Sequence, residues 1–283
     1  MLGTIAAALL IAAGPGADEG FADWLYASGE FSTAASEYLR ILYENGGDTL
    51  AVPGASLRLA RCWQELGRPL DALGLYDRLS IGLDGDGGAA ALLGIGSVLE
   101  EMDRIDGSRA AYLDAASRAE SPDLRDRGLV LAALMLAREG RWEESAAEIG
   151  AVAGRGGPLA GSAPGLAGMV ASGADLPSRS PFWCGFASAV LPGSGQMLCG
   201  NVTDGLIALG VNGAMAFLLV ESIRREEVAA SVLTGWLGLS FYGGNVYGGA
   251  RAAEGYNAAR RRELLERITE LLEEVPSASG SLP

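Results

Sequence analysis

The chain has 283 residues, a net charge of −14 and no histidine. All of its basic residues are arginine, since the sequence contains no lysine. Without histidine there is no imidazole general base, Ser-His-Asp triad or histidine metal site, and without lysine there is no Schiff base or P-loop lysine. We therefore expect no enzyme activity, cofactor or bound metal. The acidic balance also argues against nucleic acid as a partner, because phosphate binding needs clustered positive charge.

The N-terminal residues have the composition of an export signal. Residues 2–13 form an apolar run that is too short to cross a bilayer as a helix. Small residues follow up to Ala17, and acidic residues come next. This pattern predicts that residues 1–17 are a signal peptide. The alternative is an ordinary N-terminal helix of the domain that follows.

Residues 18–153 contain four copies of one pattern, which is centred on Gly29, Gly67, Asp103 and Gly140. Three further columns recur around this position. Small residues lie seven positions before it (Ala22, Ala60, Gly96 and Ala133) and five positions after it (Ala34, Ala72, Ser108 and Ser145). Large residues lie nine positions after it (Tyr38, Tyr76, Tyr112 and Ile149). A glycine can end a helix in a left-handed conformation, and residues four apart share a helix face. Each copy therefore predicts a helical hairpin, and the copies should stack into a solenoid.

Two of the copies resemble tetratricopeptide repeats. The stretches ASGEFSTAASEYLRIL and ELGRPLDALGLYDRL are similar to the G-x-[FYP]-x-x-A-x-x-x-[YF] core of that family. The other copies depart from it, with Asp103 in place of glycine and serine in place of alanine. The resemblance implies a scaffold that binds a protein partner in a groove, and it does not identify the partner.

The C-terminal part has the composition of a membrane segment. Residues 154–180 are rich in Gly, Ala, Ser and Pro and predict a linker. Residues 181–257 contain two apolar stretches, about 203–223 and 228–250, and a span needs about 20 residues. These stretches predict a transmembrane helical hairpin, which makes the whole chain all-α. Residues 182–199 contain Pro192 and predict a short helix that turns at the membrane surface, or a re-entrant element.

Polar and small residues inside the apolar stretches indicate contacts between helices. Asn212 and Asn245 should face another helix, either as packing contacts or along a pathway. Gly244 and Gly248 form a small-xxx-small pair that permits close backbone approach. Cys184 and Cys199 could form a disulfide in an oxidising compartment, or remain as buried thiols like Cys62.

The stretches ASAVLPGSGQMLCGNVTDGL and YGGNVYGGARAAEGYN carry a second resemblance. They resemble a family of uncharacterised bacterial membrane proteins with P-G-x-G-Q and G-N-x-Y…Y-N motifs, and more distantly the two-span TM2-type modules. No activity comes with this resemblance. The candidate structural or functional motif comprises Pro192, Gly193, Gly195, Gln196, Asp204, Asn212, Gly244, Asn245, Tyr247, Tyr256 and Asn257.

Residues 258–275 predict an amphipathic helix, and residues 276–283 a disordered tail. Arg260, Arg261 and Arg262 would suit phospholipid headgroups, although the same helix could instead pack on the repeats. A cleaved signal places the repeats and the tail outside and Arg224 inside, whereas the positive-inside rule would place the Arg260 cluster inside.

We therefore expect a scaffold in the bacterial inner membrane with a periplasmic repeat domain. Its expected partners are a protein in the repeat groove, membrane lipid and, through the hairpin, a possible second copy of the chain. The alternative is an accessory subunit for transport or for membrane-protein insertion that uses the glycine-rich hairpin.

Overall fold

The computed structural model describes residues 20–274, and all regular structure in this range is helical. The all-α prediction is therefore confirmed for the described part of the chain. Contacts divide it into two compact units, one formed by residues 20–175 with 264–274 and the other by residues 176–263. The predicted signal peptide and C-terminal tail lie outside the described residues.

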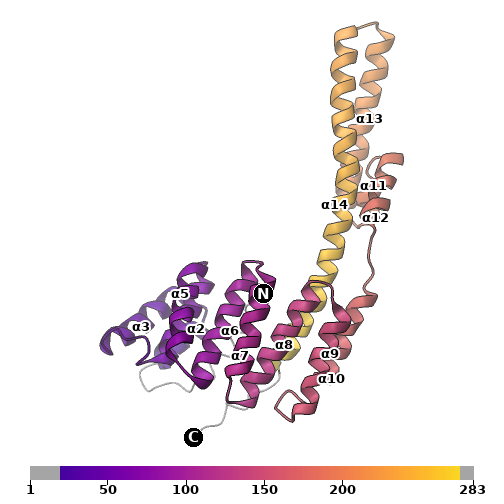
Figure 1. Ribbon diagram of the computed structural model, residues 1–283. Coiled ribbons are helices and arrows are strands. Elements are labelled where there is room, and N and C mark those ends of the chain that lie inside the picture. Colours follow the sequence, from indigo (N-terminus) through magenta and orange to yellow (C-terminus); the bar gives the residue numbers. More distant parts are fainter. Residues whose placement is uncertain (1–19, 275–283) are drawn as a thin grey trace. The chain divides into compact units, whose positions relative to one another are not determined.

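The first unit consists of antiparallel neighbours in chain order (Figure 1). Its helices are α2 (Gly20–Ala27), α3 (Phe31–Glu44), α4 (Pro53–Glu65), α5 (Pro69–Gly82), α6 (Gly85–Glu101), α7 (Ile105–Arg118), α8 (Pro122–Arg138), α9 (Trp142–Val152) and α10 (Ala163–Ala171). Each helix packs against the next one, and α4, α6 and α8 also contact one another in sequence. Helix α10 lies within the predicted linker, which is therefore partly structured.

The four aligned repeat positions form the same turn. Gly29, Gly67, Asp103 and Gly140 all have positive φ, between 57° and 85°. In each case the following N–H returns to a carbonyl of the preceding helix, as with Glu30 to Leu25 at 3.0 Å. This left-handed arrangement satisfies carbonyls that the helix end leaves unpaired. Asp103 adopts it despite carrying a side chain, so the third copy keeps the turn without glycine.

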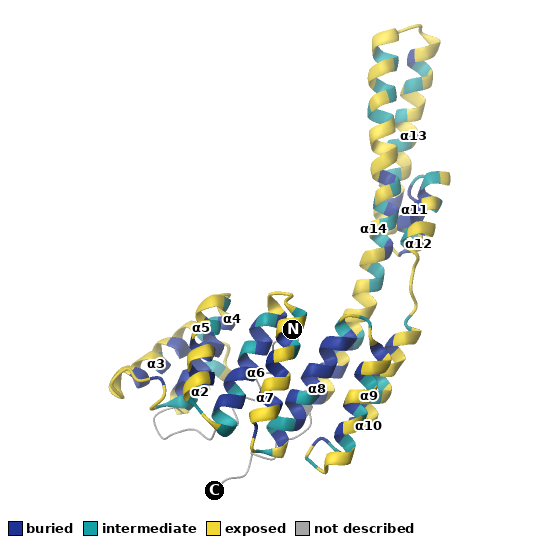
Figure 2. Cartoon of the chain, viewed as in Figure 1, coloured by how far each residue is buried: buried dark blue, intermediate teal, exposed yellow. Residues whose placement is uncertain are grey.

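The recurring columns form the core of this unit. Tyr38, Tyr76 and Tyr112 are fully buried, and so is Ile149 in the fourth copy. The small residues seven positions before each turn leave space for these rings. At Gly96, for example, a Cβ would overlap the Tyr112 ring. In Figure 2 the buried residues are concentrated in the helices between α4 and α8. The repeat pattern therefore corresponds to a regular packing scheme.

The second unit contains α11 (Pro181–Val190), α12 (Ser194–Leu198), α13 (Val202–Arg224) and the first part of α14 (Val228–Glu274). Helices α13 and α14 are antiparallel, since a Cβ at Gly235 would contact Leu219 and one at Gly238 would contact Met215. Glu226, with φ of 57°, lies in the short turn between them. Residues 182–199 form a short helix followed by a turn and a second short helix. A turn at the membrane surface and a re-entrant element both stay predictions for this segment.

Helix α14 joins two segments that we expected to be separate. The second apolar stretch and the amphipathic segment form one helix of 47 residues, about 70 Å long. Its last part belongs to the first unit, where Leu265, Ile268 and Leu272 are buried. The apolar face of the amphipathic segment is therefore covered by protein. For residues 264–274 this outcome agrees with our alternative that the helix packs on the repeats, whereas Arg260, Arg261 and Arg262 belong to the second unit.

Within residues 20–274, α13 alone is long and apolar enough to cross a membrane. Only 6% of the residues in its most apolar stretch are buried. The predicted second span is less apolar than α13, because glycine, tyrosine and asparagine residues dilute its apolar side chains. By composition the structure thus contains one candidate span, where the sequence indicated two.

Candidate functional site

The P-G-x-G-Q motif forms a sharp reversal between α11 and α12. Gly193 has φ of 88°, which side-chain-bearing residues rarely adopt. A Cβ at this position would also collide with the backbone carbonyl of Gly205 at the start of α13. Two independent constraints, one conformational and one steric, therefore require glycine at this reversal.

The next glycine brings backbones into contact. A Cβ at Gly195 would overlap the carbonyl oxygen of Cys184 and approach Ser188 Oγ at 2.5 Å. On the opposing helix, a Cβ at Gly248 would lie 2.9 Å from Gln196 Nε2, and one at Gly249 would lie 2.7 Å from the Cys184 carbonyl oxygen. Helices α11, α12 and α14 thus approach one another as closely as their backbones allow.

Three buried polar residues, which we call the polar knot, connect these helices. They are Ser188, Gln196 and Asn245. The Ser188 hydroxyl donates to Gln196 Oε1 at 2.9 Å, and Gln196 Nε2 donates to the Asn245 carbonyl oxygen at 3.2 Å. Asn245 Nδ2 in turn donates to the Ser188 carbonyl oxygen at 2.8 Å.

The polar knot also stabilises the glycine turn. Asn245 Oδ1 accepts the Gly193 N–H at 2.8 Å, and Ser188 Oγ accepts the Gly195 N–H at 3.0 Å. Backbone groups that the reversal would otherwise leave unpaired are therefore satisfied by side chains. The polar knot contains a hydroxyl and two carboxamides and no titratable group, so its chemistry suits a structural lock.

Several predicted site residues lie outside this lock. Asp204, Gly244 and Tyr247 are exposed, and a Cβ at Gly244 would meet no described atom within 4 Å. The close approach of α14 to α11 and α12 therefore occurs at Gly248 and Gly249, and Gly244 has no part in it. Asn212 donates to the Ala208 carbonyl oxygen of its own helix at 2.8 Å, where we expected a contact to another helix.

Tyr256 and Asn257 form a second contact with the segment before α11. The Asn257 carboxamide accepts the Arg179 N–H at 2.8 Å and donates to the Arg179 carbonyl oxygen at 2.9 Å. The guanidinium of Arg179 lies 5.6 Å from the centroid of the Tyr256 ring, and that of Arg260 lies 5.5 Å from it. The second half of the motif thus holds the chain at the entry to α11.

Two further features accompany the motif. The sulfur atoms of Cys184 and Cys199 are 3.5 Å apart, and both side chains are buried. A groove of about 530 Å³ runs between α13 and α14. It is lined by Pro192, Leu209, Asn212, Gly213, Met215, Ala216, Leu219, Thr234, Gly235, Gly238, Leu239 and Tyr242.

The first unit contains polar contacts that link neighbouring repeats, and sequence reasoning missed them. Gln64 Nε2 donates to Ser97 Oγ at 2.9 Å and to Glu101 Oε1 at 2.5 Å, and Arg138 pairs with Glu100 at 3.0 Å. Gln64 and Glu100 occupy equivalent positions, three residues before the turn. This equivalence was a usable signal. We call these five residues the repeat ladder.

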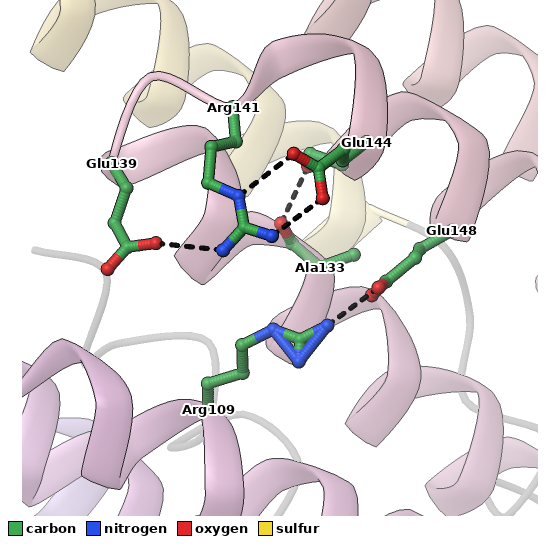
Figure 3. A network of polar contacts seen from close by, with 7 residues as sticks. Arg109, Ala133, Glu139, Arg141, Glu144 and Glu148 are labelled. Atoms are coloured by element: carbon green, nitrogen blue, oxygen red, sulfur yellow. Dashed lines mark hydrogen bonds and ion pairs between the residues drawn. The ribbon is translucent and has the colours of Figure 1, made fainter.

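A more exposed network lies around α9. In Figure 3 Arg141 lies between Glu139 and Glu144, and Arg109 of α7 reaches Glu148 of α9 at 2.6 Å. Most of these side chains are partly accessible to solvent, so the network lies on the surface beside the turn and is not part of the core.

Comparison with models of protein families, with curated proteins and with solved structures finds no match to this chain. Within residues 20–274 there is also no group of three Cys, Asp or Glu side chains placed to hold a metal ion. The interpretation of function therefore rests on the geometry of the two units.

Proposed function

We propose that the chain is a membrane-anchored scaffold, in which the second unit lies in lipid and the helical repeats recruit a protein partner. The observation that carries this proposal is the inverted burial of the second unit. Its interior contains small and polar residues such as Gly195, Ser188 and Asn245. Its surface carries large apolar side chains, among them Leu206, Ile207, Phe217, Val220 and Ile223 on α13.

Water would be a poor solvent for this surface. The five α13 side chains are 54–67% exposed, and burying such a side chain fully is worth about 1.5–3 kcal/mol. A hydrocarbon environment removes this cost. It also strengthens the requirement that the polar knot be satisfied internally, because no water is available to replace a missing partner.

The connectivity of the first unit supports two crossings. Residues 20–175 and residues 264–274 belong to the same compact unit, so both ends of the second unit face the same compartment. A single crossing by α13 then requires a second crossing by the first part of α14. Asn245, Gly248 and Gly249 of this stretch contact α11 and α12, which relieves part of their cost in lipid.

We place the repeats in the periplasm of a bacterial inner membrane and the Arg224–Glu227 turn in the cytoplasm. The predicted signal peptide and the positive-inside rule for Arg224 and Arg225 support this orientation. Single cysteines at the exposed positions Ser32 and Glu226 test it in intact cells with a membrane-impermeant maleimide. Labelling at Ser32 and protection at Glu226 is expected, and the reverse pattern would invert the orientation.

The proposed partner surface follows the second helix of each repeat. Leu39 and Tyr43 of α3, Ile81 of α5 and Leu113 of α7 are exposed apolar side chains at two equivalent repeat positions four residues apart. They therefore form a stripe on one face. The first helices α4, α6 and α8 are largely buried, and the repeat ladder lies along them. A groove along these first helices remains a prediction.

Photo-crosslinking tests the stripe directly. A photoreactive phenylalanine analogue at Tyr43, which is 84% exposed, should capture one envelope protein in living cells. The matched control places the same analogue at Glu44, the neighbouring position in α3, which points elsewhere on the helix. Capture from Tyr43 alone supports the scaffold. No capture from any stripe position would contradict it.

A second candidate function is an accessory role in transport or membrane-protein insertion. The groove between α13 and α14 favours it, because Asn212 brings a carboxamide to an otherwise mainly apolar lining. Small residues such as Gly213 and Gly235 in the same lining would also suit a second copy of the chain. Asn212→Leu should abolish such a function without lowering the abundance of the protein in membranes. Full function in this variant would contradict the role.

A further inference from the structure

We infer that Arg179 and Arg260 form a binding site for the phosphate of an anionic phospholipid, beside the start of α11. This inference rests on the proposed membrane insertion and deepens it by naming a lipid class. The two arginines come from segments 81 positions apart, and both guanidinium groups lie near the ring of Tyr256.

The two guanidinium groups are held in place. Both lie within 6 Å of the centroid of the Tyr256 ring, the range in which a cation is attracted by an aromatic face. The Asn257 carboxamide accepts a hydrogen bond from the Arg179 N–H and donates one to the Arg179 carbonyl oxygen, which fixes the backbone of Arg179. Ordering the arginines before a ligand arrives lowers the entropy cost of binding.

The site lies at the level of lipid headgroups when α13 spans the hydrocarbon core. The contacts of Gly235 with Leu219 and of Gly238 with Met215 set the register of the two helices, and extending it makes Val202 level with about Arg251. Tyr256 is therefore about 7.5 Å beyond the start of the span. The headgroup region extends about 5–8 Å beyond the hydrocarbon on each side.

Side-chain direction in α14 favours the same placement. Helical side chains lean towards the N-terminus of their helix, and for residues 251–263 that direction is towards the bilayer. The guanidinium of Arg260 accordingly lies over the ring one turn earlier. Arginine also extends its apolar stem along the protein and leaves its charged end in the headgroup layer.

Exposed aromatic residues on α11 mark the same level. Phe182, Trp183 and Phe186 are 70%, 63% and 53% exposed, and they pack edge to face at centroid distances of 5.2 and 5.7 Å. They begin three residues after Arg179. Phenylalanine and tryptophan at the surface of a membrane protein lie at the boundary between tails and headgroups. A lipid whose tails contact these rings would bring its phosphate close to Arg179.

Positive charge is available at the site. Among the described residues Arg179 forms no ion pair, and Arg260 pairs only with Glu263 across an exposed contact of 2.9 Å. Such exposed pairs are weak and readily exchanged. An arginine fork binds two phosphate oxygens in parallel, which makes a phosphodiester the matching ligand.

The test uses the full chain reconstituted in bilayer discs of phosphatidylcholine with a minority of phosphatidylglycerol. Native mass spectrometry after detergent release measures which lipid stays bound. We expect selective retention of phosphatidylglycerol, and about twenty-five-fold weaker retention in Arg179→Gln/Arg260→Gln, because each arginine at an anionic surface contributes roughly fivefold. The control Arg78→Gln/Arg104→Gln removes two exposed arginines of the first unit and should retain the lipid like the parent chain.

A variant of the ring guards against misfolding of the double variant. Tyr256→Leu leaves both charges but releases the guanidinium groups, so retention should fall by a smaller factor. Equal retention of the two lipids by the parent chain would overturn the inference, as would unchanged selectivity in Arg179→Gln/Arg260→Gln. Complete competition by soluble glycerol phosphate would also overturn it, since the site would then bind a free anion. A chain that never enters the bilayer would instead refute the proposed function.

Discussion

The two units of this chain solve the packing problem in opposite ways. In the first unit, large side chains such as Tyr38, Leu59 and Leu134 fill the interior. In the second unit the interior consists of backbone contacts at glycine and a satisfied polar knot, and the large apolar side chains face outwards. The second arrangement fits the proposed lipid environment, because only water drives apolar side chains inwards.

The turns, by contrast, are the same in both units. Gly200 precedes α13 with φ of 89°, and Glu226 precedes α14 with φ of 57°. As in the repeats, the N–H of the next residue donates to a carbonyl oxygen of the preceding helix. Asn201 donates to Gln196 in this way, and Glu227 donates to Ser222. Ending a helix is a local backbone problem, so the same solution serves in both units.

The largest expected effect concerns glycine in the second unit. Gly195→Ala should destabilise this unit by about 3 kcal/mol or more, because the added methyl group overlaps a backbone carbonyl that cannot move away easily. Gly210→Ala is the matched control, since its Cβ would meet no described atom within 4 Å. Thermal unfolding of the reconstituted chain measures both variants. Similar stability in the two would refute the idea of a core made of backbone contacts.

The next effect concerns the paired thiols. Oxidation with diamide should join Cys184 to Cys199, and closing a loop of about 15 residues should raise the stability of the second unit by about 3 kcal/mol. Thiol counting with a maleimide polymer should then find only Cys62, which is fully buried, after denaturation. Reducing agent should reverse the change. Three reactive thiols after oxidation would contradict the geometry.

A third prediction separates two tyrosines of one repeat column. The Tyr112 hydroxyl donates to the buried carboxylate of Glu100 at 3.0 Å, whereas the Tyr76 hydroxyl has no partner among the described residues. Tyr112→Phe should cost about 1–3 kcal/mol, and Tyr76→Phe should be neutral or stabilising. Urea unfolding followed by circular dichroism compares the two variants. Equal losses would mean that the rings alone matter.

These contrasts also indicate what the sequence could predict. The repeat columns predict the helix pairs, the turns and the buried tyrosines, because these features depend on small residues, glycine and helical spacing within a short stretch of sequence. Gly193, Gly195, Gln196 and Asn245 were identified as one motif before their contacts were known.

Other features depend on distant partners. Ser188 completes the polar knot by accepting a hydrogen bond from Asn245, 57 positions away, and no local pattern encodes such a partner. Gly244 and Asn212 were selected by residue type, yet one faces open space and the other bonds its own helix. The continuity of α14 does not follow from the sequence either, because the composition changes between residues 250 and 258 and this change indicates two separate helices.

A smaller effect is expected when the stability of the first unit is measured at different pH values. Burial raises the pKa of Glu100 above its ordinary value of 4.5, although Arg138 and the Tyr112 hydroxyl partly offset it, and burial likewise raises the pKa of Glu101. The folded chain therefore binds protons that the unfolded chain releases. The unfolding free energy of the first unit should increase as pH falls from neutral through these raised pKa values, and the gain should be complete only below pH 4.5.

Glu100→Gln provides the control for this pH dependence. It removes the titrating carboxyl, so the slope of unfolding free energy against pH should become shallower while the Glu101 contribution remains. A parent chain that loses stability over the same interval would show that other carboxylates, stabilised as ions in the fold, outweigh these two.

The smallest effect is expected at Arg141, whose ion pairs look extensive in Figure 3. Arg141 contacts Glu144 at 2.6 Å and Glu139 at 3.4 Å, but all three side chains are at least one-third exposed. Water and salt screen such pairs, so Arg141→Gln should leave the urea midpoint unchanged. Arg138→Gln is the informative comparison, since the Glu100 side chain that it would abandon is only 2% exposed. Because an unpaired buried carboxylate is costly, only this second variant should lower the midpoint. Equal shifts in the two variants would mean that proximity of charges, and not burial of the partner, decides the strength of the repeat contacts.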